Sequence, residues 1–232
     1  MPSLAEALLE NPVWHALGGP HAAFADTRST ARARRYHPEV SVFSAAESVD
    51  DRSWTALGDL VGPSGMVALF RDRVPAPPAG WTEVFRARAR QMISPTVDAA
   101  PAPPEVSTLG PGDVGDMLAL IEAAQPGPFE VRTPELGRYV GVRRDGRLVA
   151  MAGERFRVPG ATEISAVCTH ETVRGEGWGR ILTTEVARGI QARGDVAFLH
   201  VVTDNEPAAT LYQAMGFTTR RVLDVVGAVR DD

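Results

Sequence analysis

Arg174-Gly175-Glu176-Gly177-Trp178-Gly179 lies between an apolar run, Ile164 to Thr169, and a pattern of helical spacing that begins at Trp178. The three glycines of this stretch allow positive φ angles and bring successive backbone N–H groups close together. Such groups bind an anion when they stand at the N-terminus of a helix, because the helix dipole favours negative charge there. The stretch therefore predicts a phosphate-binding turn between a strand and a helix.

Two common phosphate-binding loops fit this turn poorly. A Walker loop requires a lysine after its last glycine, and the sequence contains no lysine, since all 24 basic residues are arginine. The dinucleotide fingerprint G-x-G-x-x-G requires a glycine at position 180, where the chain has Arg180. The turn therefore belongs to a different class of phosphate site.

The pattern Arg-x-x-Gly-x-Gly, formed by Arg174, Gly177 and Gly179, resembles the acyl-CoA loop of the GNAT superfamily of N-acyltransferases. The downstream sequence resembles a second superfamily segment and consists of Asn205, Ala209, Leu211-Tyr212 and Gly216-Phe217. The resemblance implies an α/β fold with a mixed, mostly antiparallel sheet flanked by helices. It also implies that this sheet splays open between the strands at 164–169 and 196–202.

The domain organisation is predicted from a proline-rich segment, Pro95 to Pro104, which indicates an extended linker. We expect an N-terminal half at 1–97, a linker at 98–104 and a catalytic domain at 105–232. The arrangement resembles the branch of the superfamily similar to glycine N-acyltransferase, in which a degenerate GNAT-like half precedes the CoA-binding half. Within the N-terminal half, residues 81–93 fit a strand or a helix equally well.

Composition excludes several classes of function. A formal net charge of −5 argues against a general nucleic-acid binder, which requires a basic face. No apolar run approaches the ~20 residues of a membrane span, and the first residues do not resemble a secretion signal, so we expect a cytoplasmic protein with no membrane partner. His15, His21 and His37 lack the close spacing of a ligand set, and we expect no metal.

The resemblance implies how acetyl-CoA would bind. The pyrophosphate would bind the backbone N–H groups of Arg174, Gly175, Glu176, Gly177, Trp178 and Gly179. The pantetheine arm would pair with the backbone of Val167 and Thr169, and the N–H near Val167 would polarise the thioester. Asn205 would contact the pantetheine and also cap the helix that follows it.

Two residues are candidates for proton transfer. Glu163 matches the position of a glutamate base in some GNAT enzymes, a role that requires a raised pKa; alternatively, it is a glutamate at the solvated start of a strand. Strict alternation would place Glu163, Ser165, Val167 and Thr169 on one face of that strand. Tyr212 matches the tyrosine that protonates the departing thiolate; alternatively, it packs on the apolar face of its helix.

His200 interrupts an apolar strand, where a histidine is more often a hydrogen-bonded core residue than a base. Cys168 lies within an apolar run and is expected to be buried, so we expect direct attack in a ternary complex.

The sequence thus predicts an N-acetyltransferase that transfers an acetyl group from acetyl-CoA to a primary amine of a small molecule or peptide. Two alternatives remain open: a non-catalytic acyl-CoA sensor, and an acetyltransferase of protein lysines or N-termini. The identity of the acceptor and the presence of a homodimer are left open at this stage.

Overall fold

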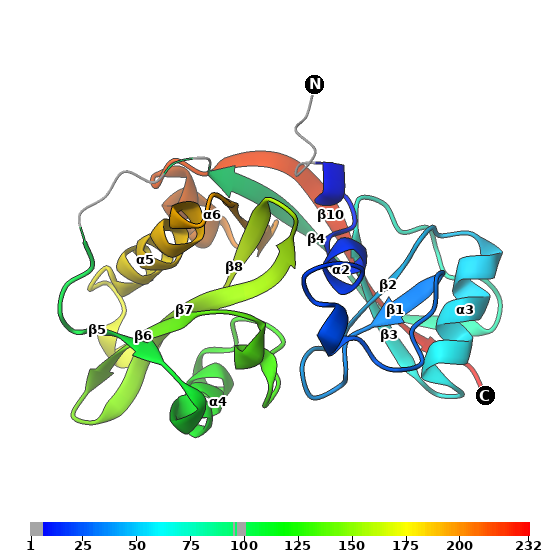
Figure 1. The fold of residues 1–232 in the computed structure, drawn as a ribbon, viewed down its shortest axis with the longest axis horizontal. Coiled ribbons are helices and arrows are strands. Elements are labelled where there is room, and N and C mark those ends of the chain that lie inside the picture. Colours follow the sequence, from blue (N-terminus) through cyan, green and yellow to red (C-terminus); the bar gives the residue numbers. More distant parts are fainter. Residues whose placement is uncertain (1–6, 95, 97–100) are drawn as a thin grey trace.

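The computed structural model describes residues 7–94, 96 and 101–232, which form a mixed α/β fold (Figure 1). Ten strands form one sheet in the order β1-β2-β3-β10-β4-β9-β8-β7-β6-β5. The described pairs are antiparallel except for β2 with β3 and β8 with β9, which are parallel. The mixed, mostly antiparallel sheet predicted from the sequence is confirmed.

The strands are β1 (Ala33–Arg35), β2 (Phe43–Ala46), β3 (Met66–Arg71), β4 (Trp81–Ser94), β5 (Val106–Leu109), β6 (Tyr139–Arg144), β7 (Arg147–Val158), β8 (Ala161–Thr169), β9 (Val196–Val202) and β10 (Thr218–Arg230). The helices are α2 (Pro12–Leu17), α3 (Asp51–Val61), α4 (Val114–Ala124), α5 (Trp178–Ala192) and α6 (Glu206–Gln213). Short 3₁₀ turns span Ala22–Phe24, Pro111–Asp113, Thr133–Leu136 and Glu171–Val173.

In the second half of the chain, helices cover both faces of the sheet (Figure 1). Helices α5 and α6 pack on one face, where Leu182, Val186 and Ile190 of α5 are fully buried against β6, β7 and β9. On the other face, α4 buries Met117 and Leu120 against β6 and β7. The buried residues of α5 recur at spacings of four, as expected of a helix with one apolar face.

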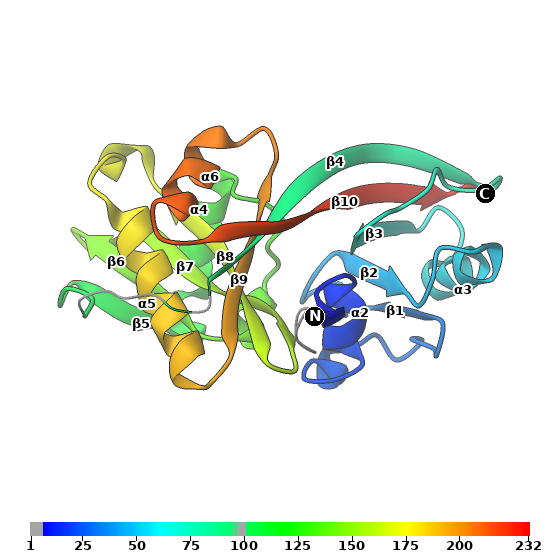
Figure 2. The same cartoon turned by 90° about the horizontal axis from the view of Figure 1, so that it is seen from above.

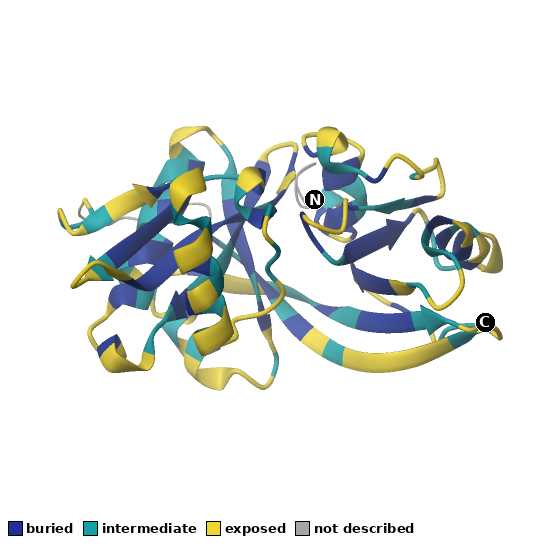
Figure 3. Cartoon of the chain, turned by 90° about the horizontal axis from the view of Figure 1, so that it is seen from below, coloured by how far each residue is buried: buried dark blue, intermediate teal, exposed yellow. Residues whose placement is uncertain are grey.

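Strands β4 and β10 join the two halves of the molecule. They run side by side over almost their whole length and extend from one lobe to the other (Figure 2). Strand β10 also pairs with β3, whereas the last six residues of β4 pair with β9. The first part of β4 is exposed, and its partner β10 is mostly shielded (Figure 3). The ambiguous segment at 81–93 is therefore a strand of the shared sheet.

The two halves also share an apolar core. Phe43 and Phe70 pack on Phe156 of β7, with ring centroids 5.3 and 6.4 Å from that of Phe156. The division into 1–97, 98–104 and 105–232 stays a prediction, and residues 98–100 of the linker lie outside the described residues.

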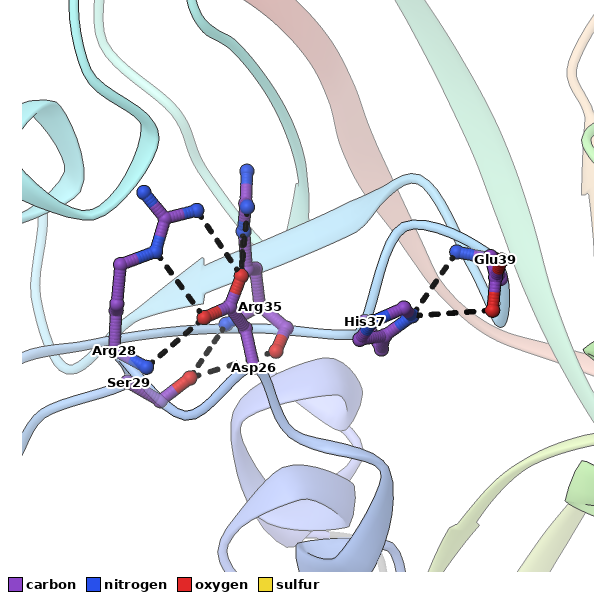
Figure 4. Close-up of polar contacts among 6 residues, drawn as sticks. All are labelled: Asp26, Arg28, Ser29, Arg35, His37 and Glu39. Atoms are coloured by element: carbon purple, nitrogen blue, oxygen red, sulfur yellow. Dashed lines mark hydrogen bonds and ion pairs between the residues drawn. The ribbon is translucent and has the colours of Figure 1, made fainter.

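Polar contacts fix the loop around β1 in the N-terminal half (Figure 4). The Asp26 carboxylate accepts hydrogen bonds from the Arg28 backbone N–H at 2.9 Å and from Arg35 Nε at 2.8 Å. Further along, His37 Nδ1 lies 3.8 Å from a Glu39 carboxylate oxygen. These contacts are local to the loop and serve to hold it in place.

Candidate functional site

The turn before α5 has the backbone shape expected of an anion site. Gly175 and Gly177 adopt left-handed φ angles of 84° and 86°, which favour glycine. Gly177 is the N-cap of α5, and no side chain caps this helix. The N-terminus of α5 is thus free of the side-chain acceptor that usually satisfies it.

Most backbone N–H groups of residues 174–180 have no hydrogen-bond partner among the described residues. No acceptor among the described residues is found for five of them, those of Gly175, Gly177, Trp178, Gly179 and Arg180. Two others do have partners, because the N–H groups of Arg174 and Glu176 donate to Glu171 and Val173 at 3.3 and 3.4 Å. Five free donors at the positive end of a helix can bind a phosphate group.

The side chains around the turn do not oppose an anion. The Glu176 carboxylate accepts a hydrogen bond from Trp178 Nε1 at 2.9 Å and lies 3.3 Å from the Arg144 guanidinium. Arg144 therefore compensates the negative charge of Glu176. Arg174 is exposed and has no carboxylate partner among the described residues. The Glu176 carboxylate is thus held by Trp178 and Arg144, and its backbone N–H donates to Val173, so the free donors of the turn come from its neighbours.

Strands β8 and β9 separate beyond their first four pairs. Residues 161–164 pair in parallel with 196–199, and no pairing continues past Ile164. At this point β8 carries a bulge, since two residues of β8, Ala166 and Val167, oppose the single residue Ala152 of β7 between the pairs that Ser165 and Cys168 form. Ala166 adopts a left-handed φ of 51° in the bulge. The splay predicted from the sequence is present, and a strained alanine marks its start.

The bulge overturns the predicted alternation of side chains along β8. Ile164 and Val167, three residues apart, pack against the same core, whereas Ala166 and Cys168 pack against another. Strict alternation would have grouped Ile164 with Cys168 instead. The prediction that Glu163, Ser165, Val167 and Thr169 share one face is therefore wrong, because the extra residue reverses the faces beyond Ser165.

A cavity of about 500 Å³ occupies the splay. One wall is formed by Ser165 to Val167 of β8, Val201 of β9 and Tyr212 of α6. The opposite wall comes from strands of the N-terminal half. The cavity thus adjoins the β8 backbone where the pantetheine arm was expected to lie.

Tyr212 lines this cavity and lies within the core that α5 and α6 cover. Its ring packs on Phe217 with centroids 6.1 Å apart, while its hydroxyl has no hydrogen-bond partner among the described residues. Burial, with a smaller contribution from Cys168, raises the pKa of Tyr212 to about 12. The hydroxyl therefore stays protonated at neutral pH and can donate a proton into the cavity.

Asn205 is the N-cap of α6, as predicted, because its Oδ1 accepts the Ala208 N–H at 3.1 Å. It also lines the cavity. Val167 is half-buried at the cavity wall, and Thr169 follows it at the end of β8. Burial raises the pKa of the Cys168 thiol to about 12, so this cysteine is a poor nucleophile.

Glu163 is fully buried rather than solvated. Its carboxylate accepts hydrogen bonds from Arg155 Nε and Nη2 at 2.8 and 2.7 Å and from the Phe156 N–H at 3.2 Å. It also lies 2.7 Å from His200 Nδ1. The alternative of a solvated strand start is therefore wrong, because Glu163 belongs to a buried charged network.

The pKa of Glu163 shifts in the direction opposite to that expected of a base. Burial acts to raise this pKa, but the charge and hydrogen bonds of Arg155, together with the hydrogen bond of His200, lower it to about 2. A carboxylate with such a low pKa is a weak acceptor of a proton at neutral pH. The raised pKa that the predicted base role requires is thus absent.

Both ring nitrogens of His200 are occupied within the network. Nδ1 faces Glu163, and Nε2 lies 3.0 Å from the amide nitrogen of Gln91, whose oxygen accepts from Arg220. Burial lowers the pKa of His200 and outweighs the opposing effect of Glu163, so the ring is neutral, with its proton on Nδ1. His200 therefore serves as a hydrogen-bonded core residue.

Comparison with known proteins identifies the family. A family model described as "FR47-like protein" matches residues 139–225. A crystal structure of an acetyltransferase assigned to the GNAT family, from Novosphingobium aromaticivorans, superimposes with a TM-score of 0.89 at 35% identity and covers 97% of this chain and 99% of that one. The chain belongs to the GNAT family of acetyltransferases.

Two curated relatives of this GNAT protein match over shorter stretches. The N-alpha-acetyltransferase RimI of Mycobacterium tuberculosis is 37% identical over 106 residues, which is 43% of this chain and 65% of RimI. The uncharacterized protein ML0378 of Mycobacterium leprae is 30% identical over 167 residues, which is 67% of this chain and 45% of ML0378. The matched regions thus span less than two thirds of either relative. The resemblance to the glycine N-acyltransferase branch stays a prediction.

No sequence pattern points to Arg155, the charged residue that lines the cavity together with His200. It is one of 24 arginines, and its partner Glu163 lies on the neighbouring strand across a hairpin. Only the register of β7 against β8 brings the two side chains together. Among the described residues, no cluster of three or more metal-ligating side chains is present, and no helix is long and apolar enough to cross a membrane.

Proposed function

We propose that this GNAT protein transfers an acetyl group from acetyl-CoA to a primary amine by direct attack in a ternary complex. The observation that carries the proposal is the set of five unpaired N–H groups at the N-terminus of α5. It is supported by the cavity that β8 and Tyr212 line, in which the tyrosine hydroxyl has no hydrogen-bond partner among the described residues. The proposed cytoplasmic location rests on the sequence alone.

In this proposal the pyrophosphate of acetyl-CoA binds the turn at 174–179, where the α5 dipole adds to the hydrogen bonds. The pantetheine arm lies in the splay beside Val167 and Thr169, within reach of Asn205. The bulge at Ala166 frees the β8 backbone from regular pairing, so that an N–H near Val167 can polarise the thioester carbonyl.

The amine attacks the thioester carbon as a neutral nucleophile. A mostly apolar cavity that contains the Arg155 guanidinium lowers the pKa of a bound amine, because both desolvation and the like charge disfavour the ammonium form. We therefore do not assign Glu163 as the base. When the C–S bond breaks, Tyr212 donates its proton to the thiolate, and the proton that the attacking nitrogen releases returns through solvent to the Tyr212 oxygen, so that the products are a thiol and a neutral amide.

The test is incubation of the whole chain with acetyl-CoA and a panel of primary amines, followed by measurement of free CoA thiol and of the acetylated amine by mass spectrometry. Equal amounts of thiol and acetylated product are the expected result. Binding of acetyl-CoA without transfer to any amine would instead support an acyl-CoA sensor, and failure to bind acetyl-CoA would contradict the proposal.

A further inference from the structure

The cavity wall that faces the splay is one face of the sheet formed by the N-terminal half. It is built from alternate residues of two strands, because side chains i, i+2 and i+4 of a strand point to the same side. These residues are Met66, Ala68 and Phe70 of β3 and Phe85, Ala87 and Ala89 of β4. All six are apolar, and the small alanine side chains leave space between the larger ones.

At the opening of the cavity, large apolar side chains are exposed to solvent. Met66 is 45% exposed, Phe85 43% and Val202 48%, and all three line the cavity. The Phe85 ring lies over Gly227, its cross-strand partner on β10, where an added Cβ would come within 2.1 Å of the ring. Gly227 thus provides room for an aromatic ring laid against the sheet, and an exposed apolar mouth of this kind indicates a binding surface.

Charge in the cavity has one sign. Among the described residues that line it, Arg155 is the charged side chain, and no carboxylate is present. Burial acts to lower the pKa of Arg155, but Glu163 outweighs burial and raises it, so the guanidinium stays charged. Because Nε and Nη2 are bonded to Glu163, Nη1 is the part of the group that has no partner among the described residues.

The network behind Arg155 holds this donor in place. Its guanidinium is fixed by two parallel bonds to Glu163, and Glu163 is fixed in turn by His200 and the Phe156 N–H. The same guanidinium lies 4.5 Å above the Phe156 ring and 5.1 Å from the Phe43 ring centroid. A rigid N–H donor in an apolar cavity favours ligands that present an oxygen acceptor.

We propose that the acceptor is an amine with an apolar, preferably aromatic, body and a carbonyl or carboxylate oxygen that accepts a hydrogen bond from Arg155 Nη1. The inference deepens the proposed function and rests on it. Polyamines and other polycations are excluded as good acceptors, because their extra charges would lose water in an apolar cavity that offers a cation and no carboxylate.

Product analogues test this preference by binding, independently of turnover. With the protein saturated with CoA, calorimetry should show that N-acetyl-phenylalaninamide binds at least about tenfold more tightly than N-acetylputrescine, which keeps a positive charge. N-(2-phenylethyl)acetamide, which has the ring but lacks the second carbonyl, should bind with intermediate affinity. Equal affinities for the three compounds, or tighter binding of N-acetylputrescine, would overturn the inference.

Two adjacent residues of β4 supply a matched pair of variants. Phe85 is 43% exposed and lines the cavity, whereas Val84 is 51% exposed and does not line it. Phe85→Glu should weaken binding of N-acetyl-phenylalaninamide by about tenfold or more, and Val84→Glu should change it by less than about twofold. Equal effects of the two substitutions would contradict the placement of the acceptor.

Arg155→Lys tests the oxygen contact. The lysine keeps a positive charge opposite Glu163 but loses the fork that leaves Nη1 free. The variant should lose most of the preference for N-acetyl-phenylalaninamide over N-(2-phenylethyl)acetamide. An unchanged preference would show that Arg155 does not contact the acceptor. If Arg155→Lys does not fold, the comparison of Phe85→Glu with Val84→Glu still tests where the acceptor binds. Failure of the proposed function is recognised separately, by a lack of acetyl transfer despite normal binding of these analogues.

Discussion

Tyr212 and Asn205 line one cavity with Arg155, and Glu163 lies in the buried network that holds the Arg155 guanidinium. Tyr212 and Asn205 could be predicted because their motif places both around one helix, and the structure brings both to the cavity. The environment of Glu163 could not be predicted, because its pairing with Arg155 depends on strand register rather than on sequence spacing. The lowered pKa of Glu163 disfavours the predicted base role, and its hydrogen bonds hold Arg155 and His200 in place.

Replacement of Tyr212 by phenylalanine removes the hydroxyl and keeps the ring that packs on Phe217. We expect Tyr212→Phe to bind CoA with unchanged affinity while kcat falls by ~10²–10⁴-fold, the range of general acid catalysis. Steady-state kinetics with an amine that the parent acetylates measure kcat, and calorimetric titration with CoA measures the affinity. A kcat within about threefold of the parent would show that Tyr212 serves only in packing.

The Glu163 network predicts a pH dependence of stability. Because folding lowers the pKa of Glu163 from 4.5 to about 2, its stabilising effect is complete above pH 4.5 and is lost as pH falls from there toward 2. Urea unfolding at pH 7 and pH 3 should show that the free energy of unfolding falls less between these pH values in Glu163→Gln than in the parent. Glu163→Gln should also be less stable at pH 7 by about 3–5 kcal/mol, because Arg155 loses its partner.

Glu105→Gln, at an exposed position, is the control for this comparison. It should follow the parent at both values of pH. If Glu163→Gln lost as much stability as the parent between pH 7 and pH 3, the network would not be the source of the acid sensitivity.

Among the elements, β8 determines the shape of the site, and its bulge could not be predicted from the sequence. Periodicity predicts a regular strand over 163–169, because neither glycine nor proline marks the extra residue. The bulge at Ala166 starts the separation from β9 and turns Val167 toward the core of α5 and α6. The helices and the β6–β7 hairpin, by contrast, can be predicted from short stretches of sequence. The turn of this hairpin is Asp145-Gly146, a pair typical of such turns, and both residues have positive φ angles.

The left-handed φ of Ala166 can be tested by substitution. A non-glycine residue in this region is strained by ~1–2 kcal/mol, so Ala166→Gly should leave the free energy of unfolding unchanged or raise it slightly. Ala152→Gly, in β7 at a residue whose φ is not positive, should lower it by about 1 kcal/mol. Chemical denaturation measures both, and equal losses in the two variants would argue against strain at Ala166.

At the scale of the whole molecule, the sheet passes through both halves without interruption. The sequence predicted two halves from a proline-rich segment, but no local pattern shows that β4, before that segment, inserts between β9 and β10. Strand pairing over more than 100 residues of sequence depends on the assembled core. The cavity wall of β3 and β4 and the turn before α5, where we propose that the acceptor and CoA bind, therefore come from different halves of the chain, which β4 and β10 join (Figure 2).

This arrangement predicts that residues 105–232 do not fold alone. Without the first 104 residues, β9 loses its partner β4, and β10 loses both β3 and β4, which leaves unpaired strand edges. Circular dichroism and urea unfolding should show no cooperative transition for this fragment. A fragment that unfolds cooperatively and binds CoA would show instead that 105–232 is an independent domain.

The central claim, that acetyl-CoA binds at the N-terminus of α5, is tested most directly by calorimetric titration of acetyl-CoA into the parent, Gly179→Val and Gly115→Val. Both glycines are the second residue of a helix, and a Cβ at 179 meets only Leu211 at 3.8 Å while one at 115 meets nothing within 4 Å. We predict tight binding by the parent and Gly115→Val, and affinity at least about tenfold weaker for Gly179→Val, whose side chain would occupy the space of the phosphate. Unchanged affinity of Gly179→Val would contradict the account.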